Sequence, residues 1–217
     1  DINFISAWLL SLSFTFQFYF DFSGYVDMAT GSALMLNIKL AQNFNSPFKS
    51  LSIIDFWHRW HMTLSNFLTN FVFTPWIMSL KKINFIKTMI ILLIVFLLAG
   101  LWHGPSWTFV VFGLMHGLGL ILNHCFRKFT SFKINKFFSW FITFNYINFT
   151  FLMFRSENLN DFLKIFTKML DYKFIINNHY LNIDISNQQL IILIFSIIVC
   201  FYFNNSHYLI GKFKRED

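Results

Sequence analysis

The sequence predicts an all-α fold: a polytopic helical membrane protein in which re-entrant or irregular segments line a polar chamber. Of its 217 residues, 56% are hydrophobic and only 12% are charged, well below the roughly 25% charged residues usual in soluble domains. Long uncharged stretches alternate with basic clusters, and one region places polar residues at membrane depth. We therefore expect a single helical membrane domain over residues 1–217, with no internal repeat.

The uncharged stretches predict the membrane spans in order. A helix needs about 20 apolar residues to cross the hydrocarbon core of a bilayer. Residues 88–126 are long enough for two spans, and Gly104 and Pro105 mark the turn between them. The uncharged stretches cover residues 2–20, 60–80, 88–126, 137–154 and 185–211.

The net charge of +7 is interpreted as a topology signal. Lysines precede the stretch at 88–126, and Arg127 and three lysines follow it. Both ends of this hairpin therefore favour the cytoplasm. The turn at Gly104 then faces outward. Basic residues are not interleaved with aromatic residues in a pattern typical of nucleic-acid binding, so no nucleic-acid partner is expected.

The region "FDFSGYVDMATGSALMLNIKLAQNFNSPFKSLSIIDFWHRWH", residues 20–61, is less regular. The pair Ser23-Gly24 predicts a break, residues 29–35 a short helix, and residues 43–47 a loop. Irregular backbone persists at membrane depth only where protein or a water-filled cavity covers it. Asp21 and Asp27 stand at the end of the first span, where they indicate either a hydrated terminus or a functional carboxylate.

His103 lies in "LLAGLWHGPSWTF", between two apolar runs. One interpretation makes it an interfacial residue between the headgroup anchors Trp102 and Trp107. The other makes it a neutral imidazole in a partly dry cavity, acting as general base toward a hydroxyl. Gly104 and Pro105 fix the turn in either case. A water-accessible reaction chamber explains the ionisable ring, with the anchor as the competing interpretation.

The stretch "DFWHRWHMTLS", residues 55–65, predicts the start of an amphipathic helix. Asp55 and Arg59 are four apart and can pair, while His58 and His61 are three apart on a neighbouring strip. This segment is either a surface anchor or a means of bringing His61 into the bundle beside His103. No set of Cys, Asp or Glu completes a metal coordination sphere, so no metal site is expected.

His116 occurs in "FGLMHGLGLILNH" among Gly113, Gly117 and Gly119. Small residues allow two helices to approach closely in a membrane. We therefore assign packing as the expected role of this segment, including His116.

Four segments in order, "YFDFSGYVDMATGSALML", "NFNSPFKS", "DFWHRWHMTLSNFL" and "GLWHGPSWTFVVFGLMHGL", resemble the membrane-bound O-acyltransferase superfamily, in particular its bacterial branch that includes the alginate O-acetylation protein. The resemblance covers roughly residues 14–124, and residues 148–170 resemble a later span with its amphipathic segment. It implies that this chain is the C-terminal half of a longer multi-pass protein of the bacterial inner (cytoplasmic) membrane.

The resemblance also implies site residues. His103, in W-H-G, and His61, in R-W-H, are the implied catalytic histidines. His103 would accept the proton of the acceptor hydroxyl as its oxygen attacks the acyl carbonyl. The implied substrate-binding residues are Asp21, Ser23, Tyr25, Asp27, Asn45, Asp55, Arg59, Trp102 and Trp107.

The implied reaction moves an acyl group, expected to be acetyl, to hydroxyls of an extracytoplasmic polysaccharide. The implied donor is acetyl-CoA or an acyl carrier, with no covalently bound cofactor. The expected partners are membrane lipid, the envelope polysaccharide and a periplasmic or extracellular acetylation protein. Two alternatives stay open: D-alanine transfer to teichoic acid by a related acyltransferase, and a non-catalytic channel or transport subunit.

Overall fold

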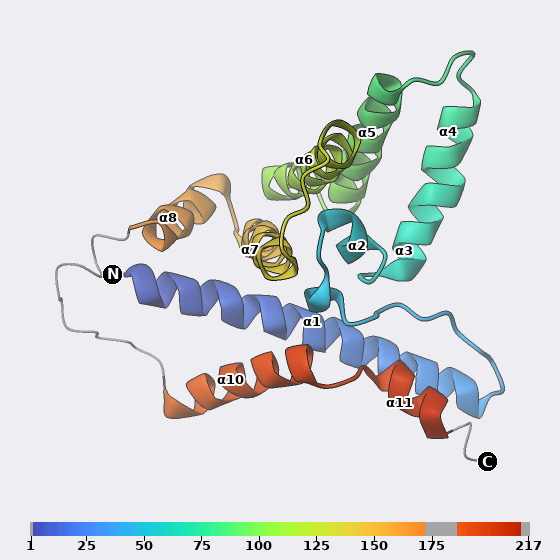
Figure 1. The fold of residues 1–217 in the computed structure, drawn as a ribbon. Coiled ribbons are helices and arrows are strands. Elements are labelled where there is room, and N and C mark those ends of the chain that lie inside the picture. Colours follow the sequence, from blue (N-terminus) through green and yellow to red (C-terminus); the bar gives the residue numbers. More distant parts are fainter. Residues whose placement is uncertain (1, 172–185, 214–217) are drawn as a thin grey trace.

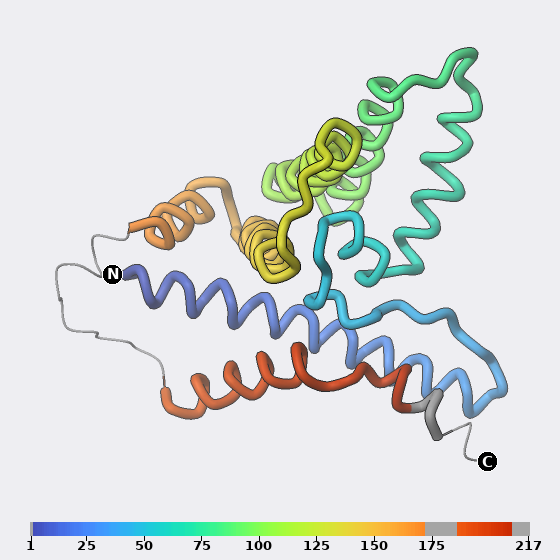
Figure 2. Tube along the Cα trace, viewed as in Figure 1, coloured from blue at the N-terminus to red at the C-terminus, as the bar shows by residue number. Residues whose placement is uncertain are grey.

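The computed structural model describes residues 2–171 and 186–213, and the described part is all-helical (Figure 1). Residues 1, 172–185 and 214–217 lie outside the described residues, and so does the beginning of the predicted span at 185–211. The long helix α1, Phe4–Met35, lies between two helices on one side, α7, Lys136–Arg155, and α8, Leu159–Met169, and one helix on the other, α10, Asn187–Tyr202 (Figure 2).

Helix α1 runs without interruption through Ser23 and Gly24. The predicted break at this pair, with a separate helix at 29–35, is therefore wrong. Serine and glycine each cost a helix at most about 1 kcal/mol, far less than proline. Phe18 and Phe22, four residues apart, bury one face of α1 against Trp60 directly before this pair.

Of the region predicted to be irregular, 20–61, only residues 36–61, here called the irregular segment, depart from one continuous helix. It contains one turn of 3-10 helix at Pro47–Lys49 and the short helix α2, Ile53–Trp57. The Asn123 side chain on α6 accepts hydrogen bonds from the backbone amides of Ile53 and Ile54, at 2.7 and 3.3 Å. These bonds satisfy amides at the start of α2 that have no partner within the helix, so this non-helical stretch is fixed by the bundle.

The stretch predicted as a span at 60–80 is a helical run in three parts: α3, Met62–Phe67, a π-helical turn, Leu68–Phe73, and α4, Thr74–Met78. The prediction that an amphipathic helix begins at residue 55 is wrong, because α2 ends at Trp57 and a turn precedes α3. The run lies beside α5 (Figure 1).

Helices α5, Phe85–Trp102, and α6, Trp107–Phe129, form the predicted hairpin. Gly100 and Gly113 face each other across it, and a Cβ on either would collide with the backbone of the other helix. The expected close packing through glycine is confirmed at Gly113.

Helix α7, Lys136–Arg155, packs against both α1 and α6, and α8, Leu159–Met169, follows it. The buried Asn148 side chain on α7 accepts hydrogen bonds from the hydroxyls of Ser11 and Thr15 on α1, at 3.0 and 2.7 Å. Polar side chains that pair across helices in this way hold membrane bundles together.

The last predicted span is divided into α10, Asn187–Tyr202, and α11, Ser206–Phe213. The Lys49 ammonium group donates a hydrogen bond to the carbonyl of Phe203 at the break, over 2.8 Å. The prediction of a single span over 185–211 is therefore wrong, because polar contacts with the irregular segment end α10.

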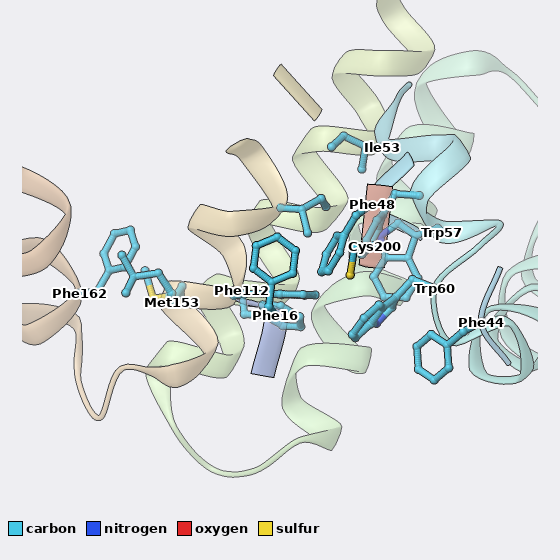
Figure 3. Close-up of a cluster of buried hydrophobic side chains, with 14 of the residues drawn as sticks. Phe16, Phe44, Phe48, Ile53, Trp57, Trp60, Phe112, Met153, Phe162 and Cys200 are labelled. Carbon is cyan, nitrogen blue, oxygen red and sulfur yellow. The ribbon is translucent and has the colours of Figure 1, made fainter. Parts of the chain in front are cut away.

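Three helices among the described residues are long and apolar enough to cross a membrane: α5, α6 and α7. They match the hairpin predicted within 88–126 and the span predicted at 137–154. The buried aromatic core lies between these helices, α1 and the irregular segment. Figure 3 shows Phe16 and Phe112 at its centre, with Trp57, Trp60 and Phe44 to one side.

Candidate functional site

His103 stands where the chain reverses between α5 and α6. Its backbone amide donates to the carbonyl of Gly100 over 3.1 Å, which closes the last turn of α5. The next residue, Gly104, has a φ of 149°, a conformation that side chains disfavour. The sharp turn therefore depends on glycine directly after the histidine, and it places the imidazole at the end of the hairpin.

Aromatic rings surround the half-buried imidazole of His103. Phe154 of α7 presents its ring perpendicular to it at 5.0 Å between centroids, and Phe112 of α6 lies at 5.9 Å. This burial lowers the pKa of His103 below its usual value of 6.5, because a low-dielectric surrounding disfavours the charged ring. The imidazole is therefore neutral at neutral pH and able to accept a proton.

His61 occupies the turn before α3 in a left-handed conformation, with a φ of 44°. Its Nδ1 lies 3.1 Å from Oδ1 of Asn43, and its ring stands perpendicular to Phe22 at 4.8 Å. Burial lowers the pKa of His61, and the charge of a protonated His103 lowers it further. The structure thus brings the two implied catalytic histidines within electrostatic reach of each other.

Helix α1 connects the surroundings of the two histidines. Phe22 contacts His61, and Phe18, one turn earlier, stacks on Phe154 with 5.1 Å between ring centroids. Phe154 in turn contacts His103. Phe18 and Phe22 are one turn apart on α1, so this helix fixes the spacing between the surroundings of the two histidines.

Asp55 and Arg59 form the predicted ion pair, at 2.8 Å and with about a third of each side chain exposed. Arg59 also accepts a backbone hydrogen bond from Asn45 through its carbonyl, over 2.9 Å. These contacts tie the loop at 43–47 to the turn that carries His61. They give Asp55 and Arg59 a role in shaping the loop, which is compatible with the predicted substrate contact.

A cleft of about 250 Å³ with mixed polar and apolar walls lies between α1, the loop at 40–46 and the junction of α10 with α11. Ser23, Asp27 and Asn43 contribute to its wall. Asp27 accepts a hydrogen bond from the Ser206 hydroxyl over 3.0 Å. An adjoining, more open hollow of about 320 Å³ is lined by Asn45 and Arg59.

Asp21 and Tyr25 do not line either cavity, and both are exposed. The outward direction of these two side chains has a geometric reason. In an uninterrupted helix, residues four apart share a face, so Asp21 and Tyr25 point outward together while Ser23 and Asp27 border the cleft. Trp102 and Trp107 are 69% and 74% exposed, and the Trp102 ring contacts His103 at 5.0 Å.

Three features of the site have no clear signal in the sequence. Asn43 contacts His61, although Asn45 is the residue of that loop predicted from the resemblance. Phe154 reaches His103 from a distant helix. The indole of Trp57 donates a hydrogen bond to Nδ1 of the fully buried His116 over 3.2 Å, so the expected packing role of His116 includes a polar contact.

Comparison with known proteins places this geometry in a family. The model of the membrane-bound O-acyltransferase family matches residues 2–160. The chain is 48% identical over 177 residues to the peptidoglycan O-acetyltransferase of Helicobacter pylori, covering 78% of this chain and 32% of that protein.

The names of more distant relatives refer to other polymers. Identity to the probable alginate O-acetylase AlgI of Azotobacter vinelandii is 36%, over 76% of this chain and 33% of that protein. Identity to the teichoic acid D-alanyltransferase of Bacillus subtilis is 32%, over 69% of this chain and 41% of that protein. The chain spans about a third of the length of the first relatives it matches, in their C-terminal part. The chain belongs to the membrane-bound O-acyltransferase family.

Proposed function

We propose that the protein containing this chain transfers an acetyl group to hydroxyls of an extracytoplasmic polysaccharide, with His103 as general base. The observation that carries the proposal is the enclosure of a neutral imidazole by aromatic rings at the α5–α6 turn. Neutral histidine in a partly dry site is suited to accept a hydroxyl proton. Membership of an acyltransferase family supplies the reaction class.

In the proposed step, the acceptor oxygen bonds to the acyl carbon while its proton passes to His103. The bond between the acyl carbon and the donor then breaks, and His103 returns the proton to the leaving group. An activated donor such as acetyl-CoA or an acyl carrier supplies the acetyl group. No covalent acyl-enzyme is needed, because the histidine activates the acceptor directly.

Peptidoglycan is the first acceptor to test, because identity to the peptidoglycan relative exceeds identity to the alginate relative. The proposed setting is the bacterial inner membrane, with lipid around the spans and a periplasmic or extracellular protein assisting the transfer. The teichoic acid relative supports D-alanine transfer as the second candidate.

The test compares envelope polymers from cells with and without the full-length protein. Mass spectrometry of released glycan fragments is expected to show acetyl esters that disappear on deletion and return on complementation. Loss of D-alanine esters with unchanged acetyl esters would favour the second candidate. Unchanged acylation of every envelope polymer would contradict both and favour a channel or transport subunit.

The pH dependence of transfer follows from the lowered pKa of His103. The base works only when neutral, so activity should persist through neutral pH and fall as pH decreases through the depressed pKa. The midpoint of this acid limb is expected below 6.5, the usual value for histidine. Initial rates of the full-length protein in liposomes measure it, and a midpoint above 6.5 would contradict the assignment.

A further inference from the structure

Asn43 holds His61 through a set of bonds that meet at one atom. Its Oδ1 lies 3.2 Å from the backbone nitrogen of Thr63, 2.9 Å from the Thr63 hydroxyl and 3.1 Å from Nδ1 of His61. The carbonyl of Asn43 also accepts the backbone amide of Met62 over 2.9 Å. With 7% of its surface exposed, Asn43 is fixed by both its backbone and its side chain.

The bonding partners determine which atom of the amide faces His61. The backbone amide of Thr63 can only donate, so the Asn43 atom opposite it must be the oxygen and not the NH₂ group. An amide oxygen only accepts hydrogen bonds. Nδ1 of His61 must therefore carry a hydrogen, and in a neutral ring the lone pair then resides on Nε2.

The backbone of His61 is also held in an unusual state. A φ of 44° is sparsely populated for a residue with a side chain, and such strain persists only where the surrounding structure enforces it. The bonds from Asn43 to residues 61–63 and the edge contact with Phe22 provide this enforcement. The ring direction and the ring tautomer are thus fixed by the same neighbour.

We propose that Asn43 is a positioning residue that locks His61 in the Nδ1–H tautomer and leaves Nε2 as its proton-accepting atom. The use of Nε2 in acyl transfer rests on the function proposed above, whereas the tautomer is a property of the protein alone. This assignment makes Asn43 part of both the cleft wall and the support of His61.

Charged neighbours of His61 are few in the described part of the chain. His103 is the titratable group that affects His61, and its positive charge would lower the pKa of His61. Arg59, two residues earlier, is paired with Asp55. A carboxylate introduced at position 43 would therefore be a new and direct influence on the protonation of His61.

The experiment uses the full-length protein with ¹⁵N-labelled histidine in lipid bilayers. The His61 signals are assigned by their loss in His61→Gln. Nitrogen chemical shifts distinguish a protonated Nδ1 from a protonated Nε2, and we expect the Nδ1–H form in the wild type. An Nε2–H form in the wild type would overturn the proposal, whatever the activity of any variant.

Two substitutions at position 43 test the link to activity. Asn43→Ala is expected to lose the single tautomer and at least ~10-fold in kcat, because a misplaced tautomer costs a histidine base much of its rate. Asn43→Asp keeps the acceptor, so it should retain the Nδ1–H form. Its carboxylate should raise the pKa of His61 by about 1 unit or more, which the pH dependence of the His61 nitrogen shifts measures directly.

Thr63→Val is the matched control: it removes a hydroxyl that lies 2.9 Å from Oδ1 of Asn43 and 3.4 Å from Nδ1 of His61, and it leaves the contact between Asn43 and His61 in place. It should retain the Nδ1–H tautomer, because the backbone amide of Thr63 still orients the Asn43 oxygen toward His61. An unchanged tautomer in Asn43→Ala, or an unmoved pKa of His61 in folded Asn43→Asp, would contradict the role of Asn43. Normal transfer by His61→Gln would instead remove His61 from the proposed reaction and leave the tautomer assignment intact.

Discussion

Replacement of His103 by glutamine is expected to reduce acyl transfer by at least ~10²-fold, the usual contribution of a positioned general base. Glutamine retains a polar side chain of similar reach but cannot accept the hydroxyl proton at neutral pH. The protein should still insert, because the turn depends on Gly104 and on the cap of α5 formed by the backbone of His103. Acetyl esters on the envelope polymers, measured at equal protein level, report the loss.

His58→Gln is the control for this experiment. His58 is exposed in the turn between α2 and α3, so the same chemical change there should leave acetyl transfer at the wild-type level. Normal transfer by His103→Gln would remove the base assignment. In that case the anchor interpretation, with Trp102 and Trp107 beside the histidine at the membrane surface, would account for the residue.

Substitution of Gly113 by alanine is expected to destabilise the hairpin by about 1–3 kcal/mol, the usual cost of forcing an extra methyl group into a packed contact. The new Cβ would collide with the backbone carbonyl of Phe96 and approach Gly100. Backbone cannot yield as a flexible side chain does, so α5 and α6 must separate. The midpoint temperature of unfolding of the full-length protein in detergent should fall. Size-exclusion chromatography of heated samples measures it.

Substitution of Gly31 by alanine should change the stability in the opposite direction. Nothing lies within 4 Å of a Cβ at this position in α1, and alanine is favoured over glycine in a helix by about 1 kcal/mol. Gly31→Ala should therefore keep or raise the thermal midpoint. Equal effects at Gly31 and Gly113 would show that helix propensity, and not the close approach of α5 and α6, determines the stability of the hairpin.

The sequence by itself determined the class of the fold and the position of its principal turn. Length and hydropathy identify α5, α6 and α7 as spans, because a membrane helix must be apolar over nearly its whole length. Gly104 and Pro105 locate the reversal at His103, because both residues restrict backbone geometry locally. The ion pair of Asp55 with Arg59 follows from their spacing alone.

Local signals failed where distant contacts decide the structure. Ser23-Gly24 predicts a break, yet α1 continues, because neither residue costs a helix more than about 1 kcal/mol. The spacing of His58 and His61 suggests one helical strip, yet the backbone turns at His61. At His61, the hydrogen bonds from Asn43 and the contact with Phe22 hold a backbone conformation that local preference disfavours.

The tertiary structure alone decided how the site is assembled. The enclosure of His103 depends on Phe154, a residue of α7, and the tautomer of His61 depends on Asn43, 18 residues earlier in the chain. No period or motif encodes such pairs, because they form only when α1, α7 and the irregular segment pack together. The sequence thus identifies the histidines, and packing determines whether they are neutral and which nitrogen can accept a proton.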